Sequence, residues 1–436
     1  MFDYSIASLL PIALMSMLAF YVACNLGAND VANSMGTSVG SKALTLKQAI
    51  IAAGILEFSG AVLFGHGVSQ TLATEIFNLE AFVHQPQILL IGMVSVLIAS
   101  GVWLQIATRQ GLPVSSSHAI VGAIAGFSAI AAGVGAVDWQ TIGIISLTWL
   151  ITPLMSGTIS ALFYSLIRQG ILNHRQPLKQ LREWIPWLSA ALLSVFGVLV
   201  LPQLSVSIQS IFQQHWGWQL PAHDFAIAIG LVATGSLTWV SWQQLEAKIA
   251  EPEQTISDRS EIPQEHTVER LLAQFQVLSA CFVAFAHGSN DVGNIVAPLA
   301  VILHINNTGS IPMENFDVPV WILVLGGAGI VTGLAIWGKN VILTVGENII
   351  SLTPSAGFCA ELATATTVLL ASKLGLPVST SHALVGGVLG IGLLQGWRSV
   401  RLDTVRSIGL AWLITVPSAT ALAALIFVVI RWVTVH

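Results

Sequence analysis

Charged residues are scarce in this sequence. Only 8% of the 436 residues are Asp, Glu, Lys or Arg, and 54% are hydrophobic, whereas a soluble domain carries about 25% charged residues. The chain therefore has too few charges to cover a surface that faces water. This excludes a soluble globular fold and favours an all-α polytopic membrane protein, in which the net charge of −5 says little about partners.

Motifs of several other function classes are missing as well. The three cysteines, Cys24, Cys281 and Cys359, have no metal-ligand spacing, so we expect buried thiols. No GxxxxGK[ST] phosphate loop occurs, and the basic clusters are too sparse for nucleic acid. No basic region surrounds Asp3, so a cleaved signal peptide is not expected. We expect neither an enzyme nor a resident cofactor.

Apolar runs long enough to cross a bilayer recur throughout the chain. The clearest runs are Ile6–Cys24, Gln48–Phe64, Ile88–Ile106, Ile142–Ile167, Trp187–Val206, Phe225–Val240, Leu271–Ala286, Val318–Trp337 and Ser407–Ile430. Pro113–Val134 and Pro377–Leu394 are apolar too, but they are rich in Gly, Ser and His. These runs predict a multi-pass protein of the cell membrane.

The sequence contains an internal duplication. The matching pairs are GLPVSSSHAIVG (111–122) with GLPVSTSHALVG (375–386), GAND (27–30) with GSND (288–291), and WLIT at 149–152 with WLIT at 412–415. Their offsets of 264, 261 and 263 residues preserve order and spacing. We therefore expect a first repeat (1–183), an extra transmembrane helix pair (184–242), a charged cytoplasmic linker (243–270) and a second repeat (271–436).

The distribution of positive charge predicts how the halves are oriented. Basic residues crowd two loops, which the positive-inside rule places in the cytoplasm: Arg168, Arg175, Lys179 and Arg182 in the first half, and Arg398, Arg401 and Arg406 in the second. The first-half counterpart of the second loop, 135–140, contains no Lys or Arg. Equivalent loops of the two halves thus differ in their content of Lys and Arg, so they are expected on opposite sides of the membrane. This predicts inverted repeats with both termini outside. Inverted repeats allow outward- and inward-facing states around one central site.

Two polar clusters interrupt the apolar pattern. They are Asn29, Asp30 and Asn33, and their copies Asn290, Asp291 and Asn294. Nearby glycines, including Gly27 and Gly288, are expected to let the helices unwind and free backbone carbonyls. Carboxylate, amide and carbonyl oxygens together suit a small cation, whereas the alternative is a polar clamp between helices.

Two hydroxyl triplets each follow a Leu-Pro pair. They are Ser115, Ser116 and Ser117, and Ser379, Thr380 and Ser381. Since proline favours the first turn of a helix, the hydroxyls are expected where free N–H groups and the positive end of the helix dipole point outward. Two such N-termini, entering from opposite leaflets, predict an anion site, although ordinary capping uses the same donors.

Further polar residues lie in the apolar runs. Glu57 and Glu361 are deep carboxylates and therefore functional candidates, although they occupy different places in the two repeats. His118 and His382 follow the hydroxyl triplets, and Arg109 and Lys373 precede Gly-Leu-Pro. The histidines fit a hydrogen-bonded structural role or a ligand role. The basic pair fits anion attraction or snorkelling to the interface.

At these motifs the sequence resembles the PiT family of inorganic phosphate transporters. GANDVANSMGTSVGSKALT, AHGSNDVGNIVAPLA and GFCAELATATTVLLASKLGLPVSTSHALVGGVLG look like the family's signatures. The resemblance covers nearly the whole chain apart from the linker. It implies symport of phosphate with Na⁺ or H⁺, inverted repeats with broken helices and re-entrant helical hairpins, and a homodimer whose transport domain moves against a scaffold.

The resemblance and the residue pattern together give two predicted sets. The phosphate set is Asn33, Ser115, Ser116, Ser117, Asn294, Ser379, Thr380 and Ser381. The cation set is Asn29, Asp30, Asn290, Asp291, Glu57 and Glu361, with Asp30 and Asp291 as Na⁺ ligands if the coupling ion is sodium. One departure is that the stretch before the first serine motif has no carboxylate matching Glu361.

Several functions remain open at this stage. The PiT family includes sulfate permeases as well as sodium- and proton-coupled members, so substrate and coupling ion are both undecided. From a different class, an anion channel would show flux that neither saturates nor concentrates substrate. An intramembrane hydrolase using Ser115 or Ser379 would require a base oriented toward the serine, and two equivalent catalytic sites facing opposite leaflets have no obvious use.

Overall fold

The structure is a computed structural model that describes residues 6–110, 114–202, 204–205, 213, 222–250, 264–312, 316–345, 352–396 and 400–435. The described part is almost entirely helical, with one isolated bridge between Phe77 and Val137. The first half contains α1 (Ile6–Gly40), α2 (Leu46–Phe64), α3 (His66–Thr74), η1 (Leu79–Phe82), α4 (Pro86–Arg109), α5 (Ser116–Ala132), η2 (Val134–Ala136), α6 (Trp139–Ile167) and η3 (Arg168–Leu172). Next come α7 (Pro177–Leu199), α9 (Ala222–Ala250), α10 (Gln264–Asp291), α11 (Gly293–Thr308), α12 (Val320–Val345), α13 (Pro354–Lys373), α14 (Thr380–Gln395) and α15 (Leu402–Val435).

Eight helical stretches in the described part are long and apolar enough to cross a membrane. They come from α1, α2, α4, α6, α10 with α11, α12, α13 and α15. The apolar helices α5 and α14 are shorter, as the predicted hairpins require. The chain is therefore an all-α polytopic membrane protein.

The two halves pack against each other through symmetry-related pairs of helices. Helix α1 crosses α12, and its counterpart α10 crosses α2. Likewise α5 lies along α15, and its counterpart α14 lies along α6. Each half therefore completes the core of the other, and the halves form one body.

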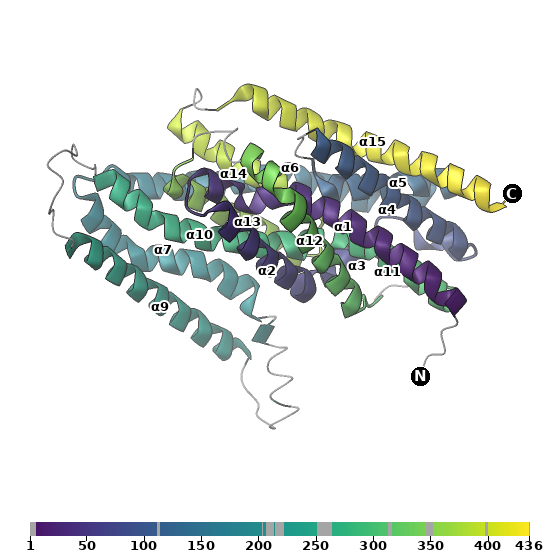
Figure 1. Cartoon of the computed structure of the whole chain (residues 1–436), viewed down its shortest axis with the longest axis horizontal. Helices are drawn as coiled ribbons and strands as arrows, with labels where there is room; N and C mark the ends of the chain where they lie inside the picture. Colours follow the sequence, from purple (N-terminus) through teal and green to yellow (C-terminus); the bar gives the residue numbers. More distant parts are fainter. Residues whose placement is uncertain are drawn as a thin grey trace.

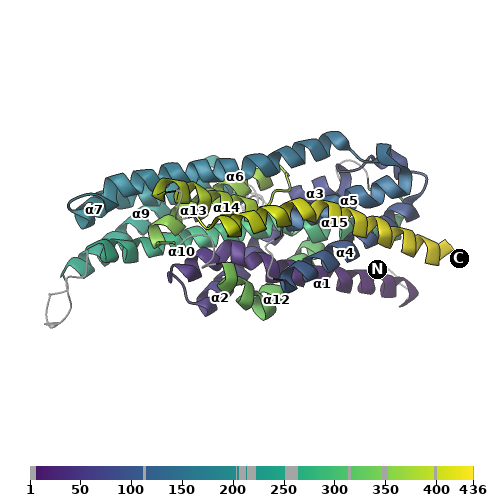
Figure 2. The ribbon, with the colours of Figure 1, turned by 90° about the horizontal axis from the view of Figure 1, so that it is seen from above.

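The α4–α5 and α13–α14 hairpins lie toward opposite ends of the molecule (Figure 1), and the turned view shows the same separation (Figure 2). The start of α1 and the end of α15 lie at the same end (Figure 1). Both observations support the predicted inverted arrangement with both termini on one side, which stays a prediction.

Glycine acts differently from the sequence-based expectation at the first Asn-Asp cluster. Helix α1 is continuous from Ile6 to Gly40, so the expected unwinding at Gly27 is wrong. Gly27 and Gly288 instead allow close crossings: a Cβ at Gly27 would lie 2.1 Å from the Ile330 carbonyl oxygen, and one at Gly288 would lie 2.0 Å from that of Glu57. In the second half a helix boundary falls at the cluster, at Val292, although the backbone dihedral angles of this residue stay helical.

The predicted helix pair is present with wider bounds. Helices α7 and α9 pack on each other, and Arg182 and Glu246 pair across them at 2.9 Å. Neither is among the eight described spans, so their transmembrane placement stays a prediction. The predicted linker 243–270 is helical at both ends, because α9 continues to Ala250 and α10 begins at Gln264; residues 251–263 lie outside the described part.

Candidate functional site

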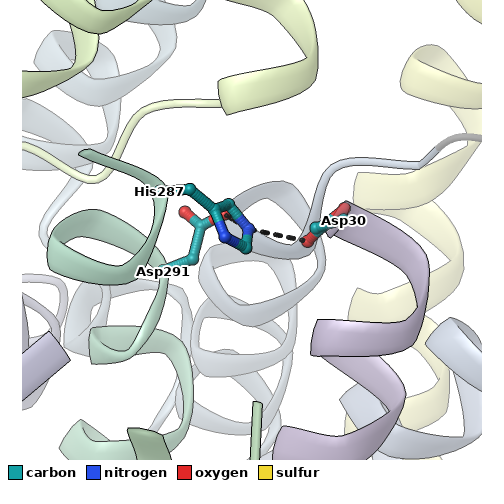
Figure 3. Close-up of side chains that lie close together, drawn as sticks. All are labelled: Asp30, His287 and Asp291. Atoms are coloured by element: carbon teal, nitrogen blue, oxygen red, sulfur yellow. Dashed lines mark ion pairs between the residues drawn. The ribbon is translucent and has the colours of Figure 1, made fainter. Parts of the chain in front are cut away.

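The two Asn-Asp motifs meet around a histidine. Asp30 points inward from α1, and His287 and Asp291 point toward it from the end of α10 (Figure 3). His287 Nε2 lies 2.9 Å from Asp291 Oδ2 and 3.9 Å from Asp30 Oδ2. All three side chains are at most 2% exposed, so their charges are held in an environment of low dielectric constant, where each needs compensation.

A third carboxylate joins this cluster through the other ring nitrogen. His287 Nδ1 lies 3.2 Å from Glu57 Oε2, and the Ser34 hydroxyl donates to Glu57 Oε1 at 3.0 Å. Three buried carboxylates therefore surround one imidazole. If all three are ionised, one imidazolium balances only one of them, and a cation can neutralise the remaining negative charge.

Several oxygens of the cluster are free to act as ligands. Asp30 Oδ2, Asp291 Oδ1 and Asn294 Oδ1 are buried without a hydrogen-bond donor among the described residues. Pro298 lies four residues after Asn294 in α11 and lacks the N–H that would reach the Asn294 carbonyl. Ligand atoms of Asp30, His287 and Asp291 all lie within 4.8 Å of one another. Such oxygen-rich surroundings fit a hard cation.

The hydroxyl triplets lie directly against this cluster. Ser115 and Ser379 cap α5 and α14 by accepting the backbone N–H of His118 and His382. Asn294 Nδ2 donates to Ser116 Oγ at 3.3 Å and to Ser117 Oγ at 3.4 Å, while Thr380 Oγ1 donates to Asp291 Oδ2 at 3.3 Å. Asn294 thus contacts the N-terminus of α5 and Asp291 contacts that of α14, so both buried helix N-termini lie at this cluster. Helix N-termini suit an anion.

The remaining motif asparagines hold the hairpins in place. Asn29 Nδ2 donates to Thr108 Oγ1 at 3.0 Å, and Asn290 Nδ2 donates to Ser372 Oγ at 3.1 Å. Asn33 Nδ2 stays within its own motif and donates to Asp30 Oδ1 at 3.3 Å. Arg109 directly follows Thr108, and Lys373 directly follows Ser372. Both basic residues are exposed at the ends of α4 and α13.

Glu361 has a separate set of partners. Thr37 and Ser38 donate to its Oε1 at 2.5 and 2.8 Å, Gln276 donates to the same oxygen at 3.3 Å, and Ser279 donates to Oε2 at 2.7 Å. None of these donors belongs to the two Asn-Asp motifs or the hydroxyl triplets. Glu57 therefore belongs to the cluster through its contact with His287, whereas Glu361 is bonded to a separate group of four donors.

Comparison with known proteins decides the family. The model of the phosphate transporter family matches residues 26–423, which is most of the chain. The chain belongs to the phosphate transporter family. The matched range contains both Asn-Asp motifs, both hydroxyl triplets and His287.

Individual relatives of the family agree with this assignment. The chain is 40% identical over 425 residues to inorganic phosphate transporter 2-1, chloroplastic, of Arabidopsis thaliana, covering 94% of this chain and 70% of that protein. It is 39% identical over 419 residues to a putative phosphate permease of Haemophilus influenzae, covering 95% and 96%. A solved structure described as the sodium-dependent phosphate transporter superposes with a TM-score of 0.83 at 35% identity, covering 97% of this chain and 99% of that one.

Membership in this family confirms a transporter rather than an enzyme. The geometry around Ser115 agrees, because its Oγ accepts the backbone N–H of His118 at 3.3 Å and has no bond to that imidazole. A serine hydrolase would need the imidazole itself at the hydroxyl. The hydrolase alternative is thereby set aside.

His287 is the site residue that the sequence patterns did not reveal. Its counterpart in the first half is Leu26, so the duplication gave no signal for it. An ionisable residue within a membrane span is a functional candidate by default, and this rule is the one sequence signal that could have identified His287. The sequence predicts that Glu57 and Glu361 are not counterparts in the two repeats, and the helix crossings agree. Gly288 packs against Glu57, whereas its counterpart Gly27 packs against Ile330.

Glu361→Gln is expected to destabilise the protein without changing its cation dependence. The Glu361 carboxylate accepts four hydrogen bonds. In glutamine an NH₂ group replaces one of its oxygens and cannot accept a hydrogen bond, so we expect the free energy of unfolding to fall by about 1–3 kcal/mol. Thermal unfolding in detergent and uptake at varied cation concentration measure the two effects. The matched control is Glu246→Gln at the exposed pair with Arg182. A large loss of cation affinity in a fully stable variant would instead support Glu361 as a ligand.

Proposed function

We propose that this chain symports inorganic phosphate with sodium across the cell membrane by alternating access. The contact that supports coupling is the bond from Thr380 Oγ1 to Asp291 Oδ2, together with that from Asn294 to Ser116. Through these bonds the residues suited to a cation touch those suited to an anion. The two ligands would then bind side by side and influence each other directly.

Electrostatics explains the expected direction of coupling. Without a cation, the carboxylates of Asp30, Asp291 and Glu57 would repel phosphate at short range in a medium of low dielectric constant. A bound cation offsets this field, so it raises phosphate affinity, and by linkage phosphate raises cation affinity to the same degree. We therefore propose that the cation binds first.

Sodium is proposed over protons for two reasons. The solved relative is described as sodium-dependent, and the oxygens of Asp30, Asp291 and Asn294 that lack donors suit a hard cation. His287 is the group through which proton coupling would act instead. The phosphate set then consists of the hydroxyl triplets with Asn33 and Asn294, and the cation set is centred on Asp30 and Asp291.

The wider assembly belongs to the same proposal. The symmetry-related pairs of helices support an inverted pair of repeats, and the shared end of α1 and α15 supports both termini outside. A homodimer with an elevator-like transport domain is proposed on the family resemblance. Cross-linking in native membranes measures the dimer directly.

Proteoliposome uptake tests the function. An inward sodium gradient is expected to drive labelled phosphate to a higher concentration inside than outside, and collapsing the gradient with a sodium ionophore should abolish accumulation. Sulfate in place of phosphate is expected to give no accumulation. Accumulation driven only by a proton gradient would move the coupling to His287, sulfate uptake alone would overturn the substrate, and flux without saturation would identify a channel.

A further inference from the structure

Trp149 of α6 makes hydrogen bonds to the segment that joins α13 to α14 and to the first turn of α14. Its indole Nε1 donates to the Pro377 carbonyl at 3.2 Å, and its own carbonyl lies 3.1 Å from His382 Nδ1. A carbonyl can only accept, so Nδ1 of His382 carries the hydrogen. The two bonded residues, Pro377 and His382, lie on either side of the hydroxyl triplet Ser379–Ser381 in the sequence. Trp149 and His382 are 8% and 4% exposed.

A proline makes the Trp149 carbonyl available. In a helix this carbonyl would accept the N–H of the residue four positions later. That residue is Pro153, which lies inside α6 and has no N–H. Helix α14 approaches closely at the same place, since a Cβ at Gly386 would lie 2.3 Å from the Pro153 carbonyl oxygen. The unused acceptor and the close approach together bring His382 to Trp149.

The aromatic surroundings fix the orientation of the His382 ring. It lies against Trp412 with ring centroids 3.5 Å apart, and its edge meets His118 at 4.6 Å. His118 in turn lies against Trp149 at 3.8 Å. The ring of His382 is therefore held on both sides while its Nδ1 points at the Trp149 carbonyl.

Among the described residues, the equivalent contact of the first hairpin, from His118 to Trp412, is weaker than that of His382. In the second half the WLIT motif is followed by Val416 before Pro417, so the proline withholds its N–H from Leu413 rather than from Trp412. Val416 has an N–H that can reach the Trp412 carbonyl within α15. The His118 ring approaches the backbone of Trp412, but in the described part of the chain this contact lacks the distance and angle of a full hydrogen bond. One extra residue thus makes the two hairpins unequal.

We propose that Trp149 and His382 are positioning residues that hold the α14 hydroxyl triplet in register with Asp291. The segment they hold is also bonded to the site itself: Asn290 accepts from the Val378 N–H at 3.2 Å and donates to the Leu376 carbonyl at 3.1 Å. Thr380 reaches Asp291 only when this segment stays in place. The inference rests on the proposed function, because the triplet is taken to contact phosphate.

His382→Phe tests the positioning role. Phenylalanine keeps a ring against Trp412 but removes the donor to Trp149, so we expect about a tenfold rise in the phosphate concentration for half-maximal uptake, the effect of one hydrogen bond. His382→Asn keeps an N–H near the Nδ1 position and is expected to recover part of the affinity. The matched control, His118→Phe, removes only the weaker contact with the Trp412 backbone and is expected to change affinity less than threefold.

Pro153→Ala tests the same bond from the other side. The alanine N–H would compete for the Trp149 carbonyl and weaken its bond to His382. Phosphate affinity is therefore expected to fall, and the double variant with His382→Phe should be no worse than His382→Phe alone, because both remove one shared interaction. Additive losses, or a Pro153→Ala variant with unchanged affinity, would overturn the proposal.

Hydrogen exchange separates this inference from the proposed function. Backbone amides of residues 378–384 are expected to exchange faster in His382→Phe than in wild type or His118→Phe, without any substrate present. Unchanged exchange and unchanged affinity in His382→Phe would refute the positioning role. If wild type accumulated no phosphate while exchange still responded as expected, the proposed substrate would be wrong and the fastening of the hairpin would stand.

Discussion

Asp30→Asn and Asp291→Asn are each expected to abolish sodium-coupled phosphate accumulation while leaving insertion into the membrane intact. Each change keeps the shape of the side chain but removes a negative charge from a cluster in which both residues are buried. Loss of one charged ligand is expected to weaken cation binding by about 100-fold, since bonds to charged groups contribute about 1.5–3 kcal/mol. Uptake into proteoliposomes over a range of sodium concentrations measures this.

The same substitution at Asp317 is the matched control. Asp317 is 92% exposed and pairs with His66 at the protein surface, so Asp317→Asn should transport like wild type. Equal amounts of folded protein by size-exclusion chromatography establish that the site variants insert. Normal sodium dependence in both Asp30→Asn and Asp291→Asn would show that the cation site lies elsewhere.

Gly288→Ala is expected to disrupt the packing of α10 against α2 strongly. Its Cβ would lie 2.0 Å from the Glu57 carbonyl oxygen, and backbone cannot move aside as a flexible side chain can. Helices α10 and α2 must therefore separate, which pulls His287 away from Glu57. Overpacking typically costs about 1–3 kcal/mol, and we expect at least that loss together with loss of uptake.

Thermal unfolding in detergent and phosphate uptake together check this result. Gly143→Ala is the control, because nothing lies within 4 Å of the added carbon there. Gly27→Ala should behave like Gly288→Ala, since its Cβ would lie 2.1 Å from the Ile330 carbonyl oxygen. A Gly288→Ala protein with normal unfolding and uptake would mean that the crossing of α10 and α2 is looser than described.

Duplication made much of the site readable from sequence. The motif pairs indicated two Asn-Asp clusters and two hydroxyl triplets, and the resemblance grouped Asn33 and Asn294 with the triplets. In the structure Asn294 contacts Ser116, and Thr380 contacts Asp291. The helical membrane fold also followed directly from composition and apolar runs. These features depend on local chemistry and on symmetry, both of which are visible along the chain.

The contacts that break the symmetry were not predictable in this way. His287 has Leu26 as its counterpart, and Glu57 has Ile330, so no repeated pattern marks either residue. Glu361 finds its donors on α1 and α10, and which helices meet is decided by tertiary packing. The glycines were assigned to unwinding because local flexibility can be read from sequence, whereas the close crossings they serve cannot.

The boundary between α10 and α11 falls within the second motif, at Val292, whose backbone dihedral angles stay helical. Asp291 is the last residue of α10, and Asn294 lies in the first turn of α11, whereas Asp30 and Asn33 share the uninterrupted α1. An ion bound to Asp291 and Asn294 would therefore join the end of α10 to the first turn of α11 across Val292. An ion bound to Asp30 and Asn33 would instead lie along one continuous helix.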